Sequence, residues 1–401
     1  MASESTSSIF APQMVQRATA VAGGRRLSVC HIVSGDTWAG AEVQVATLLR
    51  ALSRRGDLRV SAIVLNQGRL AEELRRSGIV VKIIPETRFG FGEVLQIARE
   101  FLAERGAQVV HSHRYKENLL AVLAARMGRV PVQVRTVHGM REPFRGWDGI
   151  RQSLLHMVDR WSGRLAADAI IAVSEGMTPR LAEMYGQRKI ATIRNGIETA
   201  QVQSPLNKAS ARARFKLSDA PVIGIVGRLV PVKRIDLFLC MAEQVRRERP
   251  DAQFVIAGDG PERVERMEQV RAVGWTRNVR FLGHRDDIYD VLRALDVLVM
   301  CSDHEGMPMT LLEAQWLGVP VVGRRVPGIR EVLCDGRNGL CVEGDDPHAL
   351  AGACLRLLGD PALGRALCET AAREIDANYS AGHNAELVAA LYQRLAAEAR
   401  R

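Results

Sequence analysis

Cysteine, aromatic side chains and long apolar runs are all scarce in this sequence. Seven of the 401 residues are cysteine and none forms a Cys-x-x-Cys pair, which excludes a disulfide scaffold and favours buried, reduced thiols. Phe, Trp and Tyr make up 5% of the chain, a share that suits an α/β protein better than an all-β one. No stretch approaches the roughly 18–20 apolar residues of a transmembrane helix, so a membrane-spanning protein is not expected.

Apolar and basic residues, in contrast, are plentiful. Hydrophobic residues make up 47% of the chain, which excludes intrinsic disorder, and the length predicts two domains of about 150–200 residues. The net charge of +10 arises in the first half, where residues 1–200 hold 28 Lys and Arg against 18 Asp and Glu, while the remainder holds 27 of each. We therefore expect an anionic partner for the N-terminal half. Nucleic acid is not expected, because aromatic residues are not interleaved with the arginines.

The first 26 residues are rich in Ser and Thr and contain no apolar core of signal-peptide length. We expect a flexible tail on a cytoplasmic protein. Residues 141–164 mix two Trp and several aliphatic residues with five Arg. A helix of this composition can lie on anionic lipid at the inner face of the cytoplasmic membrane. It can equally pack on a sheet with a solvated basic face, which is the more common outcome.

Short β-branched runs alternate with helical patterns along the chain, which predicts parallel sheets flanked by helices. In the first half, strands are expected near residues 27–34, 59–65, 79–84, 108–111, 132–137, 169–173 and 190–193. After an irregular segment, residues 198–221, a second series is expected at 221–227, 253–257, 279–282, 297–300, 319–322 and 339–342. The predicted α/β architecture has two Rossmann-like, doubly wound domains, residues 27–198 and 199–380, facing a central cleft, and a last helix over 381–401. Ligands of such sheets bind beyond the carboxyl ends of the strands.

Two carboxylates follow the predicted strand 297–300. Glu305 lies in a loop that contains Gly306 and Pro308, and Glu313 lies about one turn inside the helix that begins near Met309. Free N–H groups at that helix start favour an anion such as phosphate. Glu313 is placed to accept hydrogen bonds from a polyol such as ribose, and Glu305 from a sugar ring. The alternative is a solvated loop acid and a helix-surface acid.

Two further turns follow strands of the second series. Gly227-Arg228 ends one strand and Lys233 follows five residues later; a planar fork of donors beside a point charge suits a diphosphate. Two surface cations at a helix entrance would give the same pattern. Gly258-Asp259-Gly260 is a tight turn after the next strand, and it does not continue as a dinucleotide-binding fingerprint.

In the first half, a glycine-containing turn over residues 35–42 joins the first strand to a helix, where backbone N–H groups can approach phosphate. His138 closes a strand immediately before a glycine, so a structural and a functional role are equally open. His111 and His113 share a strand face without a carboxylate partner, and we expect no metal site there.

Together these elements resemble the retaining, nucleotide-sugar-dependent glycosyltransferases of family GT4, which have the GT-B fold. The resemblance covers roughly residues 27–380. Besides the motifs above and Gly40-Ala-Glu42, it includes Val173-Ser-Glu175, Arg194-Asn-Gly-Ile197 and Phe281-Leu-Gly-His284.

The resemblance implies roles for particular residues. Arg228 and Lys233 would bind the donor diphosphate, Glu313 the ribose and Glu305 the donor-sugar hydroxyls, while His138 would lie beside the transferred sugar. Residues 283–287 would border the base, and residues 381–401 would cross back to the N-terminal, acceptor-binding domain. The implied catalytic residues are Arg228, Lys233, Glu305 and His138. The implied donor site comprises Gly40, Gly227, Arg228, Lys233, Gly258, Asp259, His284, Arg285, Glu305, Gly306, Met307, Pro308, Met309, Thr310, Leu311 and Glu313.

The implied activity is retaining transfer of a hexosyl group from a nucleotide sugar, expected to be UDP-linked, to a glycan or lipid-linked acceptor. The implied setting is the biosynthesis of cell-envelope polysaccharide, exopolysaccharide or lipopolysaccharide. We expect no cofactor besides the nucleotide sugar and no metal, since the chain has no Asp-x-Asp. Ala39 stands where many members have glycine, which restricts that loop. A nucleotide-sugar epimerase of the same fold and a non-catalytic sugar-nucleotide-binding protein remain alternatives.

Overall fold

The computed structural model describes residues 26–401 except 36–37, 39, 140–156 and 158. The expected tail therefore lies almost entirely outside the described residues. Two compact units make up the chain. The first comprises the described residues up to Val173, then Thr178–Arg194 and Ala381–Arg401; the second comprises Ser174–Met177 and Asn195–Ser380. No helix in the described part is both long and apolar enough to cross a membrane.

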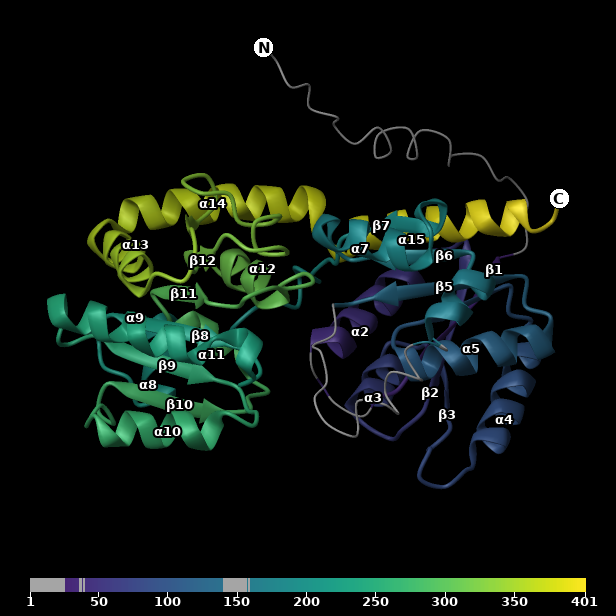
Figure 1. Cartoon of the computed structure of the whole chain (residues 1–401), viewed down its shortest axis with the longest axis horizontal. Coiled ribbons are helices and arrows are strands. Elements are labelled where there is room, and N and C mark those ends of the chain that lie inside the picture. Colours follow the sequence, from purple (N-terminus) through teal and green to yellow (C-terminus); the bar gives the residue numbers. More distant parts are fainter. Residues whose placement is uncertain (1–25, 36–37, 39, 140–156, 158) are drawn as a thin grey trace, which may run out of the picture. The chain divides into compact units, whose positions relative to one another are not determined.

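The first unit contains a seven-stranded parallel sheet in the order β3-β2-β1-β4-β5-β6-β7 (Figure 1). Its strands are β1 (Leu27–Val33), β2 (Leu58–Val64), β3 (Val80–Ile83), β4 (Val109–Ser112), β5 (Val132–Val137), β6 (Ala169–Ala172) and β7 (Ile190–Thr192). Every residue of β1 is buried, with Val29 and Val33 in one core and Cys30 and Ile32 in the other. Burial on both faces explains why the parallel strands are continuous apolar runs.

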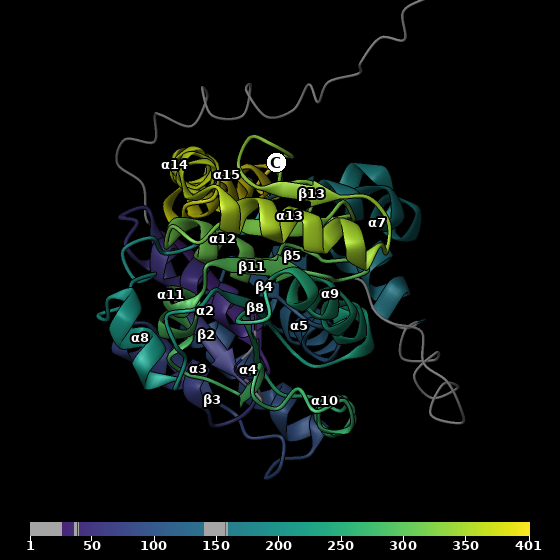
Figure 2. The same ribbon diagram turned by 90° about the vertical axis from the view of Figure 1, so that its left-hand side faces the viewer.

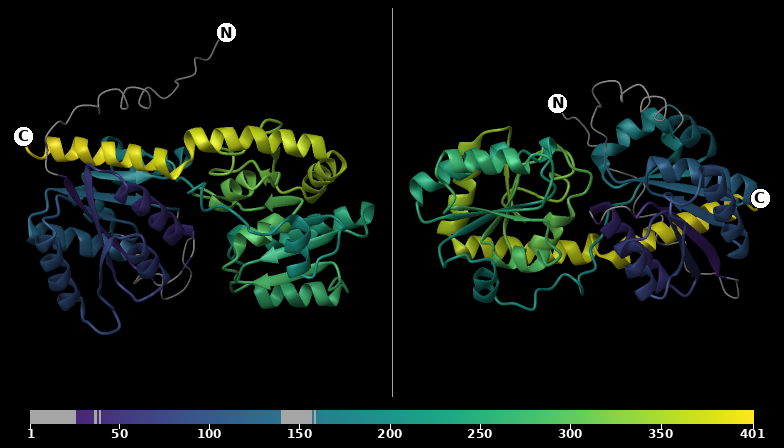
Figure 3. Two further views of the ribbon diagram at one scale, coloured as in Figure 1. Left: turned by 180° about the vertical axis from the view of Figure 1, so that it is seen from behind. Right: turned by 90° about the horizontal axis from the view of Figure 1, so that it is seen from below.

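Helices cover both faces of this sheet. One core lies against α2 (Gly40–Ser53), α3 (Arg69–Arg76) and the last helix, α15 (Ala381–Glu398). The other lies against α4 (Phe91–Glu104) and α5 (Tyr115–Gly128). Figure 3 shows α15, in yellow, beside the purple α2, with which it is in contact. A further helix, α7 (Thr178–Tyr185), lies between β6 and β7 in the sequence.

The second unit contains a six-stranded parallel sheet in the order β10-β9-β8-β11-β12-β13. Its strands are β8 (Val222–Val226), β9 (Gln253–Ala257), β10 (Val279–Gly283), β11 (Val297–Met300), β12 (Val321–Arg324) and β13 (Leu340–Val342). Its helices are α8 (Lys208–Arg214), α9 (Ile235–Glu248), α10 (Arg263–Ala272), α11 (Ile288–Ala294), α12 (Met309–Trp316), α13 (Pro347–Gly359) and α14 (Pro361–Asn378). The helices α9 and α13 pack side by side over one core (Figure 2).

The expected architecture of two Rossmann-like, doubly wound parallel sheets is confirmed. One strand position was wrong: β12 spans Val321–Arg324 rather than residues 319–322. Gly318, with φ 76°, and Pro320 occupy the preceding turn, and proline has no N–H to donate to a strand ladder. The expectation of buried thiols was also wrong for Cys240 and Cys334, which are exposed.

Each sheet has one point where the strand order reverses. In the first sheet it lies between β1 and β4, and in the second between β8 and β11. Open parallel sheets bind ligands beyond the carboxyl ends of the strands at such a point. The residues after β8 and β11 are therefore the first place to look for a site in the second unit.

Candidate active site

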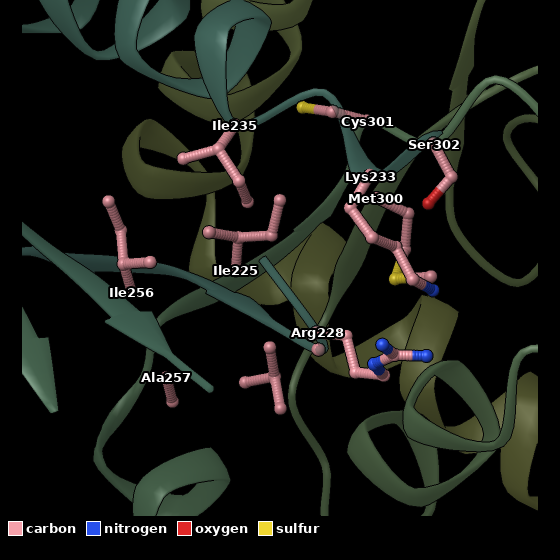
Figure 4. A pocket seen from close by; sticks show the side chains of 11 residues that line it. Ile225, Arg228, Lys233, Ile235, Ile256, Ala257, Met300, Cys301 and Ser302 are labelled. Carbon is pink, nitrogen blue, oxygen red and sulfur yellow. The ribbon is translucent and has the colours of Figure 1, made fainter. Parts of the chain in front are cut away.

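A pocket lies at the reversal point of the second sheet, beyond the carboxyl ends of β8 and β11 (Figure 4). Its lining residues are Ile225, Val226, Gly227, Arg228, Lys233, Ile235, Ile256, Ala257, Met300, Cys301 and Ser302. Most of this wall is apolar. Figure 4 shows the nitrogen atoms of Arg228 and Lys233 on the same side of the pocket. An apolar wall with two cations suits an anion attached to a larger ligand.

Lys233 and Glu305, predicted to serve different parts of a ligand, are paired in the structure. Lys233 ends a short 3-10 turn, Pro231–Lys233, and its Nζ lies 2.5 Å from Oε1 of Glu305. The Ser302 hydroxyl donates to the same carboxylate oxygen at 2.6 Å. Both charged side chains are largely buried, 23% and 13% exposed. An incoming anion would therefore have to share Lys233 with Glu305.

Arg228 is exposed and makes no ion pair with any residue in the described part of the chain. Its backbone is held in place by the turn after β9, where the Leu229 N–H donates to the Asp259 carbonyl at 2.9 Å. Only glycine fits at position 258, which has φ 139°. A Cβ there would lie 1.8 Å from the Gly227 carbonyl oxygen. The turns after β8 and β9, which were predicted separately, are thus packed against each other and together position the Arg228 guanidinium.

Arg324, a residue that the sequence did not single out, positions the loop that carries Ser302 and Glu305. Its Nη1 donates to the carbonyls of Cys301 and Ser302, at 2.9 and 3.3 Å, and to Oδ1 of Asp303 at 2.7 Å. The side chain is buried and also pairs with Asp345. In the sequence, Arg324 is recognisable only as a cation at the end of an apolar strand. The groups to which it donates are known only from the fold.

The segment after Glu305 leads into α12 and exposes little of its side chains, so it offers a ligand chiefly its backbone. The side chains of Met307, Pro308, Met309 and Leu311 are buried, whereas Gly306 and Thr310 are partly exposed. The Leu311 N–H already donates to the Pro308 carbonyl at 3.1 Å. The N–H groups of Met309 and Thr310, in the first turn, have no intrahelical acceptor and no acid in that turn. They are the better anion donors of the predicted set.

Glu313 lies inside α12 and is 7% exposed. Burial raises the pKa of its carboxyl to about 7, and a long contact of 3.5 Å from the Tyr289 hydroxyl offsets this only slightly. A ligand hydroxyl that donates to the carboxylate would favour the charged form. The side chain is therefore a buried acid with spare acceptor capacity, as a ribose-binding residue requires.

Glu313→Gln is expected to change how stability depends on pH. The folded protein keeps the Glu313 proton up to about pH 7, whereas the unfolded chain loses it near its ordinary value. The free energy of unfolding should therefore fall as pH rises between about 4.5 and 7, by about 3 kcal/mol from this group. Urea unfolding at pH 5, 6, 7 and 8 should show a smaller fall in the variant. If the free energy of unfolding falls equally with pH in the wild type, in Glu313→Gln and in the exposed control Glu265→Gln, burial of a protonated Glu313 is refuted.

The residues predicted to bind the base, His284 and Arg285, lie outside the set that lines the pocket. His284 is exposed, with its Nε2 3.9 Å from Oδ1 of Asp286. The Arg285 guanidinium forms two hydrogen bonds with Asp287, at 2.7 and 2.6 Å, and lies over the Phe215 ring. Its cation is thus already engaged by Asp287, whereas the exposed His284 side chain and the backbone of this segment are open to a ligand. Asp259 is exposed and caps its own turn by accepting from the Gly260 N–H at 2.8 Å.

Gly40 and His138 belong to the first unit. Gly40 begins α2, and part of the turn before it lies outside the described residues. His138 directly follows β5 and lies next to His113, with 3.1 Å between His138 Nε2 and His113 Nδ1. The sequence indicated no link between His138 and the pair His111 and His113. It also gave no sign of His31 and Tyr392, which complete the same cluster.

Comparison with known proteins identifies the family. The model of Glycosyltransferase Family 4 matches residues 38–201, and that of Glycosyl transferases group 1 matches residues 220–360. The alpha-maltose-1-phosphate synthase of Mycolicibacterium smegmatis is 31% identical over 317 residues, which span 73% of this chain and 80% of that protein. The chain belongs to glycosyltransferase family 4. The resemblance carried by its motifs is thereby confirmed.

Other proteins similar to this family 4 glycosyltransferase differ in their substrates. The UDP-Gal:alpha-D-GlcNAc-diphosphoundecaprenol alpha-1,3-galactosyltransferase of Escherichia coli is 28% identical over 278 residues, 66% of this chain and 70% of that protein. Among solved structures, Anabaena HepE in complex with UDP-glucose has a TM-score of 0.80 at 19% identity, covering 92% of this chain and 100% of that one. This likeness supports the GT-B fold expected from the sequence.

Proposed function

We propose that this glycosyltransferase transfers a hexosyl group, with retention of configuration, from a UDP-linked sugar to a glycan or lipid-linked acceptor of cell-envelope polysaccharide synthesis. The observation that carries the proposal is the pocket at the β8/β11 reversal point, where Arg228, with no ion-pair partner among the described residues, lies beside the paired Lys233 and Glu305. This arrangement offers two cations to a diphosphate and a carboxylate to sugar hydroxyls. The second unit would hold the donor and the first unit the acceptor.

The chemical step is the departure of the diphosphate. Negative charge grows on its oxygens as the glycosidic bond breaks, and donors already aimed at those oxygens lower the barrier. Arg228, Lys233 and the N–H groups of Met309 and Thr310 would supply them. None of the described residues that line the pocket carries a carboxylate that could act as a nucleophile, and Glu305 is held beside it by Lys233 and Ser302. The acceptor hydroxyl would therefore attack from the face that the diphosphate leaves, and a phosphate oxygen would take its proton.

Similar proteins support this assignment. The E. coli relative is named for a UDP-galactose donor and a diphosphoundecaprenol-linked acceptor. A lipopolysaccharide core mannosyltransferase of Rhizobium meliloti is 29% identical over 300 residues, 73% of this chain and 80% of that protein. The HepE structure contains UDP-glucose. An anionic or lipid-linked acceptor would also suit the +10 charge that lies in the first half of the chain.

Nucleotide binding tests the donor class. In a thermal-shift series with UDP, GDP, ADP and their hexose conjugates, UDP compounds should stabilise the protein most, by about 2.7 kcal/mol at a hundred times the dissociation constant. Arg228→Gln should weaken the effect, whereas Arg247→Gln, on the exposed face of α9, should not. Stabilisation by none of the nucleotides would count against the proposed function.

We also propose that the enzyme binds anionic membranes through its first unit. Most of residues 141–164, the segment predicted for this role, lies outside the described residues. Its described end leaves Met157, Trp161 and Leu165 exposed by 50%, 57% and 77%, four residues apart, next to the exposed Arg160 and Arg164. Apolar and basic side chains together favour an anionic lipid surface.

Sedimentation with liposomes tests the membrane proposal. The wild-type protein should pellet with vesicles that contain phosphatidylglycerol and stay in solution with phosphatidylcholine alone. The Arg160→Glu/Arg164→Glu variant should lose most of this binding, whereas Arg247→Glu, in the second unit, should retain it. Equal binding by both variants would show that this surface is not the contact.

A further inference from the structure

Four histidines and Thr136 interrupt an otherwise apolar face of the first sheet. His31 of β1 pairs in register with His111 of β4, so the two side chains share a face. His113 lies two residues beyond His111, and His138 lies two beyond Thr136, so both continue the same alternation. This face packs against α2 and α15, where the surrounding core is aliphatic. The cluster lies at the β1/β4 reversal point of the first sheet.

The polar groups of this cluster form one unbranched chain of five hydrogen bonds. Thr136 Oγ1 lies 2.7 Å from His111 Nε2, and His111 Nδ1 lies 2.5 Å from the Tyr392 hydroxyl of α15. That hydroxyl lies 3.3 Å from His31 Nε2. His31 Nδ1 is 2.9 Å from His113 Nε2, and His113 Nδ1 is 3.1 Å from His138 Nε2. The last nitrogen, His138 Nδ1, is buried and has no partner among the described residues.

All four rings are neutral near pH 7. Burial lowers the pKa of His31 to about 3 and that of His138 to about 4, and it holds the pKa of His111 and His113 well below their usual range. A neutral imidazole has one N–H donor and one bare acceptor nitrogen. Each ring in the chain therefore donates on one side and accepts on the other, so all the hydrogens in the chain must point the same way.

The Thr136 end of this row of hydrogen bonds determines the direction in which they all point. Its buried hydroxyl has one partner among the described residues, His111 Nε2. If the hydroxyl donates, its hydrogen is satisfied, and the only group left over in the chain is an N–H at His138 Nδ1. If every hydrogen bond pointed in the opposite direction, the hydrogen of the Thr136 hydroxyl and the bare Nδ1 of His138 would both lack partners. A buried polar group without a partner is costly, so the first direction is favoured.

We propose that Thr136, His111, Tyr392, His31 and His113 form a relay that holds His138 with its hydrogen on Nδ1, as a donor to a ligand oxygen. The inference rests on the proposed function in one respect, namely that the ligand is the transferred sugar and the oxygen one of its hydroxyls. The relay residues are positioning residues: they fix the tautomer of the histidine that touches the ligand. The C-terminal helix thereby takes part in the site through Tyr392.

A buried metal ion is the alternative use of these residues. Ligand nitrogens of His31, His111 and His113 lie within 4.8 Å of one another. However, the rings of His111 and His113 are stacked, 4.4 Å between centroids and 21° between planes, so their lone pairs do not converge on one point. The nitrogens that do approach each other, those of His31 and His113, lie at a hydrogen-bond distance.

The tautomers can be measured directly. Long-range ¹H–¹⁵N correlation spectra of histidine-labelled protein, assigned with single His→Gln variants, should show all four rings bare at Nε2 and protonated at Nδ1 at pH 7. An Nε2–H tautomer or an imidazolium at His138 would overturn the relay. So would a stoichiometric metal ion in the purified protein.

A matched pair of variants tests the relay from its far end, five hydrogen bonds from His138. Thr136→Val removes the hydroxyl that sets the direction, and His138 should become a mixture of tautomers. Thr136→Ser keeps the hydroxyl and should keep the Nδ1–H form. Tyr392→Phe cuts the chain in the middle and should act like Thr136→Val. An unchanged His138 tautomer in both Thr136→Val and Tyr392→Phe would contradict the relay.

Binding links the tautomer to the ligand. Thr136→Val should weaken binding of the UDP-hexose by the factor by which the Nδ1–H fraction of His138 falls, about twofold for an even mixture of tautomers, and leave binding of UDP unchanged, because UDP has no sugar for His138 to touch. Equal weakening of both ligands would mean that the relay is only structural. If the wild-type tautomers are as expected but no nucleotide binds, the proposed function fails and the relay stands. The reverse combination of results would reject the relay alone.

Discussion

Lys233→Ala should lower kcat by about 30- to 1,000-fold. A positioned donor to a developing oxyanion contributes roughly 2–4 kcal/mol to transition-state stabilisation, and Lys233 is one of two cations in the pocket. The loss should occur equally in kcat and kcat/KM, because the charge on the diphosphate grows only as the bond breaks. Steady-state release of UDP from the donor measures both parameters. Turnover close to wild type would remove the electrostatic assignment.

A second variant separates the loss of a cation from the release of Glu305. Lys233 neutralises Glu305 at 2.5 Å, so Lys233→Ala also leaves a carboxylate uncompensated beside the diphosphate. In the double variant Lys233→Ala/Glu305→Gln this repulsion is absent. If Lys233 acts on the leaving group, the double variant should still be at least about tenfold slower than the wild type, because the cation is missing. Recovery of activity would mean that the single variant failed because of Glu305. Arg247→Ala, on the surface of α9, serves as the unaffected control.

Gly258→Ala should destabilise the second unit by at least about 3 kcal/mol and abolish most activity. A Cβ at this position would meet the Gly227 carbonyl oxygen at 1.8 Å, and both partners are backbone atoms that cannot turn away. The φ of 139° adds strain for any residue with a Cβ. Relief of the clash requires the turn after β8 to move, and Arg228 would move with it.

Gly274→Ala is the matched control for this effect. Gly274 also has a positive φ, 72°, but a Cβ there would meet nothing within 4 Å. Its substitution should cost about 1–2 kcal/mol from backbone strain alone and leave kcat unchanged. Urea unfolding and UDP release, measured for both variants, separate strain from contact. If the two variants differ by less than about 1 kcal/mol, Gly258 does not hold the two turns together.

Sequence patterns predicted the sheets and the pocket because both depend on local signals. Parallel strands buried on both faces are apolar runs, and glycine turns mark their carboxyl ends. Arg228, Lys233 and Glu305 all lie within a few residues of such an end, so the rule that ligands bind there was enough to select them. The error at β12 also had a local origin, since the apolar run continues through Pro320, which the strand excludes.

The relay and the Arg324 contacts could not be predicted in this way, because their partners are distant in sequence. Tyr392 contacts His31 across 361 positions, and only the packing of α15 on the first sheet brings the two together. His31 lies inside the apolar run of β1, so its sequence neighbours give no sign of a polar cluster. Arg324 serves a loop some twenty residues earlier through carbonyl groups, which have no signature in sequence.

The stereochemistry of transfer tests the central claim most directly, and it can be measured without knowing the acceptor. Glycosyltransferases that hold a donor in water release its sugar slowly, and NMR of the anomeric proton identifies the first-formed anomer before mutarotation. With an α-linked UDP-hexose, the attack proposed here, from the face that the diphosphate leaves, predicts the α-anomer first. The β-anomer as the first product would contradict it.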